Sequence, residues 1–265
     1  MRVVNAYLPR SDGSRGYQFP GVGDFIRGSV ALHQICEERG LDLELNFSKH
    51  PLQDTLARPS PLLAEEIEDI PFFGADARPA LVSAIEAAGR ARFPSLVLFT
   101  NCATERDPGP ACRRHLIAAL APNRIIARAV AAVRERYGEY DAVHVRLDDA
   151  HLFGAAEVPP ATLSLVRAAC ARAERPLIML ASSLALKQVV EQWSIPWLST
   201  PEGVPRHCGF HTDLETTMVD FHLMAGANRI VQISEYPWGS GFSEWCAKLH
   251  DIPLTRLCLE PQPQR

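Results

Sequence analysis

The sequence predicts an α/β protein of two lobes, each built around a mainly parallel sheet. Short apolar runs alternate with longer segments of helical period along its 265 residues, a rhythm typical of β-α units. This length suits about two small domains. Pro122 separates two helix-like segments, so we expect an N-terminal lobe over residues 1–122 and a C-terminal lobe over residues 123–265.

The first lobe is expected to open with a strand and a glycine-rich loop that leads into a helix. Apolar residues at helical spacing place this helix at residues 23–38, and Gly40 follows where a helix end favours a left-handed residue. The pattern predicts strands at residues 2–8, 41–47 and 95–100, and helices at residues 62–68, 79–91, 110–120 and 123–137.

The second lobe has the more regular pattern. Its expected strands are residues 142–145, 176–180, 195–198, 229–233 and 253–257, and its expected helices are residues 161–172, 183–192, 213–225 and 241–249. Strands and helices that alternate in this way predict a doubly wound sheet. The tail from residue 260 has the composition of a disordered segment.

Composition excludes several classes of protein. The formal net charge is -4 and no dense basic stripe is present, which argues against a general binder of nucleic acid or membrane surfaces. No apolar run approaches the ~18 residues that a membrane-spanning helix needs. The seven cysteines form no C-x-x-C pair, so we expect reduced thiols and a cytoplasmic protein.

Ligands of an open parallel sheet bind beyond the carboxyl ends of its strands, so the residues after each strand are the candidates for a site. The first loop carries Gly21, Gly23 and Asp24 at a helix start, where backbone amides can approach an anion. The alternative is a tight loop in which Asp24 only favours the helix N-terminus.

A histidine and an arginine follow each other at the end of the first strand of the second lobe. Alternation along a strand puts His144 and Arg146 on one face, and a guanidinium fork suits phosphate oxygens. The alternative is an ion pair of Arg146 with Asp148 or Asp149 that only shapes the loop.

Two serine-rich turns open helices in the same lobe. Ser182 and Ser183 follow one strand, and their hydroxyls suit either a ligand or a helix cap. Ser240 and the amides of Gly241 and Phe242 follow another strand and suit a phosphate, with capping by Ser240 as the alternative.

The segment around residue 207 offers three metal-ligand types, His207, Cys208 and His211. A zinc site needs four ligands, or three and a water, and no second cluster supplies the rest. We therefore predict no metal site, with Asp213 as the N-cap of the following helix.

These features occur in an order that resembles the fucosyltransferase superfamily, which includes bacterial nodulation α-1,6-fucosyltransferases, core fucosyltransferases and protein O-fucosyltransferases. The order is Gly21-x-Gly23-Asp24, then His144-x-Arg146-x-x-Asp149, then a helix with Asp220, then the turn Ser240 to Ser243. The resemblance implies a GT-B fold with two Rossmann-like lobes. It also implies an inverting, metal-independent transferase that uses a GDP-linked sugar such as GDP-fucose as co-substrate, without a further cofactor.

The resemblance also implies roles for individual residues. His144 and Arg146 would hold the donor diphosphate, and Asp220 would contact guanine. Ser240, Gly241, Phe242 and Ser243 would form the phosphate turn, and Gly21, Gly23 and Asp24 would form the N-lobe loop that faces the leaving group across the cleft. The chemistry of an inverting transfer adds two further roles: a cation at the leaving group, for which Arg146 is the candidate, and a base, for which Asp24, Asp149 and Glu157 are candidates.

The chain departs from the family pattern at two positions. Leu147 stands where the family usually has a second arginine, and Asp24 stands where it often has asparagine. Leu147 and the short length favour one alternative, a glycan- or partner-binding protein with a degenerate transferase fold. A second alternative is a nucleotide or phosphosugar hydrolase that uses the same anion-binding loops.

Overall fold

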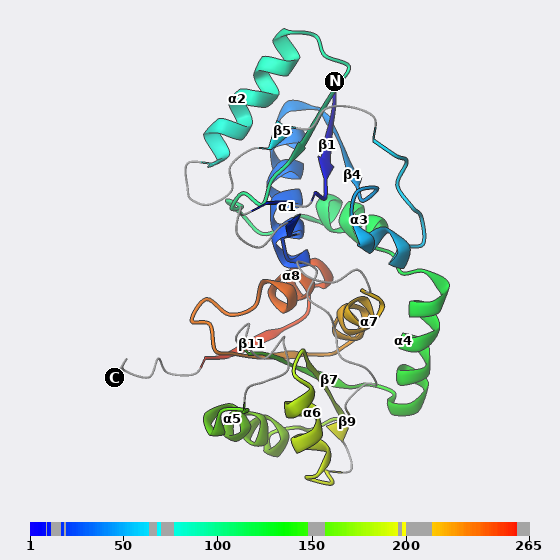
Figure 1. Ribbon diagram of the computed structural model, residues 1–265, viewed down its shortest axis with the longest axis vertical. Helices are drawn as coiled ribbons and strands as arrows, with labels where there is room; N and C mark the ends of the chain where they lie inside the picture. Colours follow the sequence, from blue (N-terminus) through cyan, green and yellow to red (C-terminus); the bar gives the residue numbers. More distant parts are fainter. Residues whose placement is uncertain are drawn as a thin grey trace. The chain divides into compact units, whose positions relative to one another are not determined.

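The computed structural model describes residues 1–8, 10–11, 17–18, 20–63, 68–69, 77–147, 157–195, 198–199 and 214–258. The chain divides into two compact units, the first containing residues 1–123 and the second starting at Arg124. Each unit has its own parallel sheet, so the predicted α/β class with two Rossmann-like lobes is confirmed (Figure 1). The acceptor-side and nucleotide-side roles of the two lobes stay predictions.

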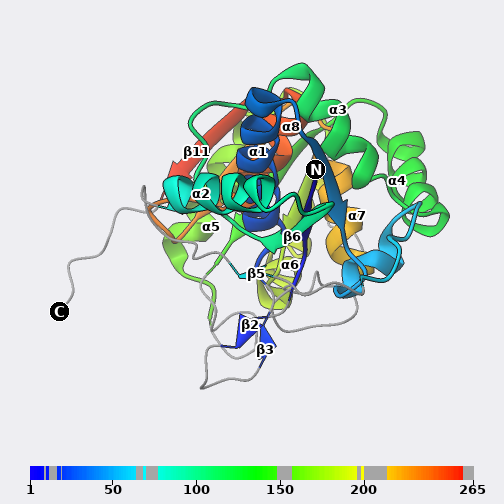
Figure 2. The same cartoon turned by 90° about the horizontal axis from the view of Figure 1, so that it is seen from above.

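The first unit is built on a four-stranded parallel sheet of order β4-β1-β6-β5. Its strands are β1 (Arg2–Ala6), β4 (Asp42–Asn46), β5 (Glu68–Asp69) and β6 (Ser95–Phe99). Helices α1 (Val22–Arg39) and α2 (Ala77–Arg90) cover one face of this sheet, because Val3, Leu32 and Leu81 belong to one buried cluster (Figure 2). The other described elements are β2 (Arg10–Ser11), β3 (Tyr17–Gln18), the 3-10 helix η1 (Pro51–Thr55) and α3 (Pro110–Ala119).

The second unit has a five-stranded parallel sheet of order β11-β10-β7-β8-β9. Its strands are β7 (Asp141–Arg146), β8 (Leu177–Ala181), β9 (Leu198–Ser199), β10 (Ile230–Ser234) and β11 (Leu254–Cys258). Its helices are α4 (Arg124–Tyr137), α5 (Pro160–Ala171), α6 (Leu184–Glu191), α7 (Glu215–Met224) and α8 (Gly241–His250). No described helix combines the length and the apolar character that crossing a bilayer requires.

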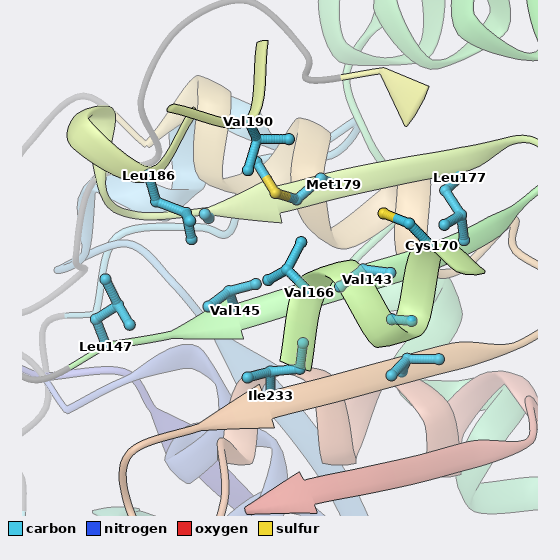
Figure 3. Close-up of a cluster of buried hydrophobic side chains, with 13 residues drawn as sticks. Val143, Val145, Leu147, Val166, Cys170, Leu177, Met179, Leu186, Val190 and Ile233 are labelled. Atoms are coloured by element: carbon cyan, nitrogen blue, oxygen red, sulfur yellow. The ribbon is translucent and has the colours of Figure 1, made fainter. Parts of the chain in front are cut away.

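Apolar residues of alternate parity divide the second sheet into two faces. Val143, Val145 and Ile233 point toward α5 and α6, where they pack with Val166 and Leu186 (Figure 3). The residues between them, including His144, therefore point to the opposite face. That face carries α8, because Ser243 of α8 hydrogen-bonds to His144.

Two predicted elements differ from the structure. The predicted helix at residues 62–68 is wrong at its described ends, because Glu68 and Asp69 pair with β6 as an edge strand and residues 62 and 63 are not helical. The predicted strand at residues 195–198 starts later, since Ser194 adopts a left-handed φ of 53° and the Leu198 amide turns back to the Ile195 carbonyl. Pairing with the sheet, rather than local propensity, decides both segments.

Candidate functional site

The order in which the chain adds strands to the second sheet reverses between β7 and β10. The chain passes from β7 through β8 to β9 on one side, and β10 and β11 lie on the other side of β7. In open α/β sheets, ligands bind outside the carboxyl ends of the strands at such a switch point. Here these ends are Arg146 and Ser234, which are direct partners in the ladder.

Arg146 lies at this switch point beside the loop that follows β10. Its guanidinium lies over the ring of Tyr236, with 5.5 Å from Cζ to the ring centroid, and its Nη1 donates to the Leu147 carbonyl at 2.9 Å. The Glu235 amide donates to the Arg146 carbonyl at 3.2 Å. The structure thus brings together the end of β7 and the loop after β10. Their contacting residues, Arg146 and Tyr236, are 90 positions apart in the sequence.

The loop after β10 ends in a helix N-terminus whose cap is open. Ser240 is the N-cap residue of α8, but its side chain makes no capping hydrogen bond. The sequence alternative of capping by Ser240 is therefore wrong. The amides of Gly241, Phe242 and Ser243 are the first of the helix and have no acceptor within it, so they suit an anion.

Gln232 holds this turn against the sheet. Its Nε2 donates to the Ser240 carbonyl at 2.9 Å and to Ser243 Oγ at 2.7 Å. Gly239 has a φ of +81°, and a Cβ there would lie 2.2 Å from Gln232 Oε1. The left-handed φ and the nearby Gln232 side chain both favour glycine at this position. The turn before α8 is therefore held against strand β10 by Gln232.

His144 lies beneath the turn rather than at its surface. The residue is 7% exposed, and its Nδ1 lies 2.9 Å from Ser243 Oγ. Gln232 donates to the same hydroxyl, so Ser243 Oγ is bonded from both β7 and β10, and the tautomer of the imidazole decides whether Nδ1 donates or accepts. Burial first, and the charge of Arg146 second, lower the pKa of His144 to about 3, so the ring is neutral at pH 7.

Asp220, predicted to contact guanine, lies in the interior of α7. It is 1% exposed, and Oδ1 accepts no hydrogen bond from any residue that the structure describes. Burial raises the pKa of its carboxyl to about 7, although the nearby Lys187 ammonium lowers it. Lys187, on α6, is also buried, and desolvation lowers its pKa while Asp220 raises it.

The two serines after β8 have different environments. Ser183 caps α6, since its hydroxyl accepts from the Leu186 amide at 3.2 Å. Ser182 Oγ is buried and has no hydrogen-bond partner among the described residues. Because β8 is the neighbour of β7, Ser182 lies at the carboxyl edge of the sheet that Arg146 also occupies.

In the first unit, Gly21 is the N-cap of α1 and Gly23 lies in its first turn. Asp24 accepts a hydrogen bond from the Gly21 amide, as the third helical residue of a capping box does, and pairs with Arg27 at 2.9 Å. Burial raises the pKa of Asp24, while Arg27 and the Gly21 amide lower it. The effect of burial is the larger, so the pKa lies above its usual value. The carboxylate is therefore held in place and is a stronger base than an ordinary aspartate.

The sequence analysis did not identify three residues that shape the ends of the two sheets. Gly28 allows α1 to touch the end of β6, because a Cβ there would lie 1.7 Å from the Thr100 carbonyl oxygen. Gln232 supports the turn that leads into α8, and a glutamine within an apolar strand was a signal of that role. Tyr236 contacts Arg146, which its place in the sequence did not indicate.

Several predicted residues fall outside the described ranges. They are Asp148, Asp149, His207, Cys208, His211 and Asp213. Within those ranges, no group of three or more His, Cys, Asp or Glu side chains is placed to hold a metal ion. Glu157 is described and exposed.

Comparison with known proteins gives structural matches only. No protein-family profile matches the sequence, and no curated protein sequence does. A mutant of Arabidopsis thaliana FUT1 in complex with GDP matches with a TM-score of 0.55 and 13% identity, over 98% of this chain and 71% of that one. NodZ α-1,6-fucosyltransferase soaked with GDP-fucose matches with a TM-score of 0.53 and 14% identity, over 94% and 92%. The fucosyltransferase NodZ from Bradyrhizobium matches with a TM-score of 0.50 and 14% identity, over 92% of this chain and 91% of that one.

Proposed function

We propose that this chain, which has the fold of the fucosyltransferases, is a glycosyltransferase that takes its sugar from a GDP-linked donor such as GDP-fucose. The observation that carries the proposal is the meeting of Arg146 and the open N-terminus of α8 at the switch point of the second sheet. A cation and the first amides of a helix, which have no acceptor within that helix, suit a diphosphate when they lie at one place. The matched structures with GDP and GDP-fucose add support for this ligand.

The proposed reaction is a single displacement with inversion. An acceptor hydroxyl oxygen forms a bond to the anomeric carbon while the bond from that carbon to the diphosphate oxygen breaks. The electron pair of the broken bond stays on the diphosphate, which leaves as GDP, and the acceptor proton passes to a base. Arg146 and the amides of Gly241 and Phe242 would stabilise the negative charge on the leaving group, without a requirement for a metal ion.

The second layer of the site would hold these groups in position. Gln232 and His144 both bond to Ser243 Oγ, so the first turn of α8 is tied to β10 and β7. Because His144 is neutral, it adds no charge to the diphosphate site, and we propose that it acts by positioning α8. Ser182, Ser240 and Asp220 stay candidates for donor contacts.

The base is proposed from Asp24 and Asp149. Asp24 has the described geometry: its carboxylate is fixed by Gly21 and Arg27, and burial raises its pKa. A carboxylate with a raised pKa accepts a hydroxyl proton more readily. Asp149 keeps its place through the sequence motif alone. The acceptor would be a glycan or another small hydroxyl compound.

One observation favours a second function, a non-catalytic protein that binds a glycan or a partner. Leu147 is 1% exposed within the apolar cluster under α5 and α6. The family usually has a second arginine here, so the chain has exchanged a cation for core packing. Such a protein would bind GDP weakly or not at all.

The cellular location is proposed from the cysteines. Cys36, Cys102, Cys112, Cys170 and Cys246 are free and buried. Burial raises the pKa of Cys36 to about 11 and that of Cys112 to about 12, so these thiols are unreactive. Free thiols suit a reducing compartment, and we propose the cytoplasm.

The experiment is a thermal-shift panel of GDP, UDP, ADP and pyrophosphate, followed by transfer assays with GDP-fucose. A ligand at ~100 times its dissociation constant adds about 2.7 kcal/mol of stability. Selective stabilisation by GDP supports the proposal. Stabilisation by UDP alone would indicate a UDP-linked donor instead. No shift with any of the four ligands would favour the non-catalytic binding protein.

A matched pair of variants tests the site itself. Arg146→Ala removes the arginine over Tyr236, and Arg167→Ala removes an arginine of α5 that lies over Trp193 at 4.0 Å. Both lose a cation on an aromatic ring in the same unit. Only Arg146→Ala is expected to abolish the GDP shift and the transfer. Equal effects of the two variants would contradict the assignment.

A further inference from the structure

Trp238 is a large apolar side chain left in solvent beside the proposed diphosphate site. It is 70% exposed, in the loop between β10 and α8, two residues before Ser240. An exposed indole contributes none of the stabilisation that its burial would bring. Aromatic side chains with one apolar face in water are common in sites that bind ligands with apolar faces.

The side chain is held in place, although it is exposed. Its ring stacks on Tyr236, with 5.1 Å between the ring centroids and 26° between the planes. The Gly239 amide donates to the Tyr236 carbonyl at 2.9 Å and closes a turn around Pro237 and Trp238. The Tyr236 amide donates to Ser234 Oγ at 3.1 Å, which ties the turn to the end of β10.

This aromatic pair is continuous with the anion-binding groups. Tyr236 contacts the guanidinium of Arg146, and the turn passes from Gly239 directly into the N-terminus of α8. Trp238 is thus joined to the guanidinium through Tyr236 and to α8 through the turn at Gly239. The stack on Tyr236 covers one face of the indole, and no ring in the described parts of the chain stacks on the other.

We propose that Trp238 is a stacking platform for the pyranose ring of a sugar that reacts at this site. The inference rests on the proposed transferase function. A pyranose has an apolar face of C–H bonds and a rim of hydroxyls, so a platform with one open face covers the C–H bonds and leaves the hydroxyls to water. The sugar is that of the donor or the terminal residue of the acceptor, and in either case C–H bonds of the ring would lie on the indole.

The test compares Trp238→Ala and Trp238→Phe with Leu184→Ala. Leu184 is a matched control, because it is an exposed apolar residue of the same unit, 53% exposed on α6. Calorimetry measures the affinity of each variant for GDP and for GDP-fucose. If the platform holds the donor sugar, Trp238→Ala weakens GDP-fucose about tenfold, or ~1.4 kcal/mol, and leaves GDP unchanged. Trp238→Phe keeps most of the affinity, and Leu184→Ala keeps all of it.

A second arm reports on the acceptor sugar. In ¹H–¹⁵N spectra the indole signal of Trp238 is identified by its loss in Trp238→Phe, among four tryptophans in the chain. Methyl glycosides of fucose, galactose, glucose and N-acetylglucosamine are added to the protein, with and without GDP. If the platform holds the acceptor, this signal moves, the signals of Trp193 and Trp245 stay, and Trp238→Ala leaves both GDP and GDP-fucose unchanged.

Two results would overturn the proposal. Equal weakening of GDP and GDP-fucose in Trp238→Ala would show that the indole acts on the part common to both ligands and not on the sugar. Unchanged donor affinities together with an indole signal that no glycoside moves would remove any role in sugar binding. Failure of the proposed function is distinct, because it appears as a wild-type protein that does not bind GDP, and the glycoside titration without GDP still tests Trp238.

Discussion

Replacement of Gly28 by alanine should destabilise the first unit, because no space exists for a methyl group. A Cβ at Gly28 would lie 1.7 Å from the Thr100 oxygen, 2.5 Å from the Thr100 carbonyl carbon and 2.7 Å from Asn101 Cα. All three are backbone atoms, so no side chain can rotate away. Helix α1 and the end of β6 would have to separate by roughly 1 Å or more in a close-packed interior.

The expected loss follows from two opposing effects. Forcing an extra carbon into a packed core costs typically ~1–3 kcal/mol, and a backbone obstacle belongs at the upper end or above. Alanine in place of glycine within a helix returns up to ~1 kcal/mol. We therefore expect a net loss of about 2 kcal/mol or more, which lowers Tm by roughly 4–8 °C in a chain of this size.

Gly89→Ala is the matched control, since Gly89 lies in helix α2 and a Cβ there meets nothing within 4 Å. This variant should be as stable as the wild type or gain up to ~1 kcal/mol. Urea unfolding followed by circular dichroism measures both. If Gly28→Ala matches Gly89→Ala in stability, the close approach of α1 to β6 is refuted.

Three further substitutions test the site residues one by one. Ser240→Ala should change the free energy of unfolding by less than ~0.5 kcal/mol, because the side chain makes no cap bond; a loss near 1 kcal/mol in urea unfolding would contradict this. Asp220 has a folded-state pKa raised to about 7, so its burial destabilises the fold increasingly as pH rises from about 4 to 7. The stability gain from Asp220→Asn should thus grow over that range, by up to a few kcal/mol, and a pH-independent gain would disprove the shift. Asp24→Asn should keep stability within ~1 kcal/mol, since its pair with Arg27 is partly exposed, and lower transfer by roughly 100-fold; wild-type transfer would move the base elsewhere.

The sequence predicted the doubly wound order because most strands are strongly apolar and separated by clear helical periods. Alternation along β7 also placed His144 and Arg146 on one face correctly. It did not show that α8 covers His144, which bonds to Ser243 of that helix. Arg146, at the end of β7, is half-buried, whereas His144 is buried. Depth within a face depends on which helix covers it.

The features that the sequence did not predict share a cause, namely contacts between residues far apart in the chain. Gly28 is required by the backbone at Thr100, which the spacing of the glycine loop did not reveal. Strand β5 exists because Glu68 and Asp69 meet the edge of β6, against the helical pattern around them. Such constraints come from the assembled sheet and are invisible in a local window.

The most direct measurement of the central claim is a titration of ¹⁵N-labelled protein with GDP, followed through the backbone amide signals. If the diphosphate binds at the switch point, the largest shifts fall on Gly241, Phe242 and Ser243, and Arg146→Ala removes them while Arg167→Ala retains them. Saturable GDP binding that leaves these three amides unmoved would contradict the account.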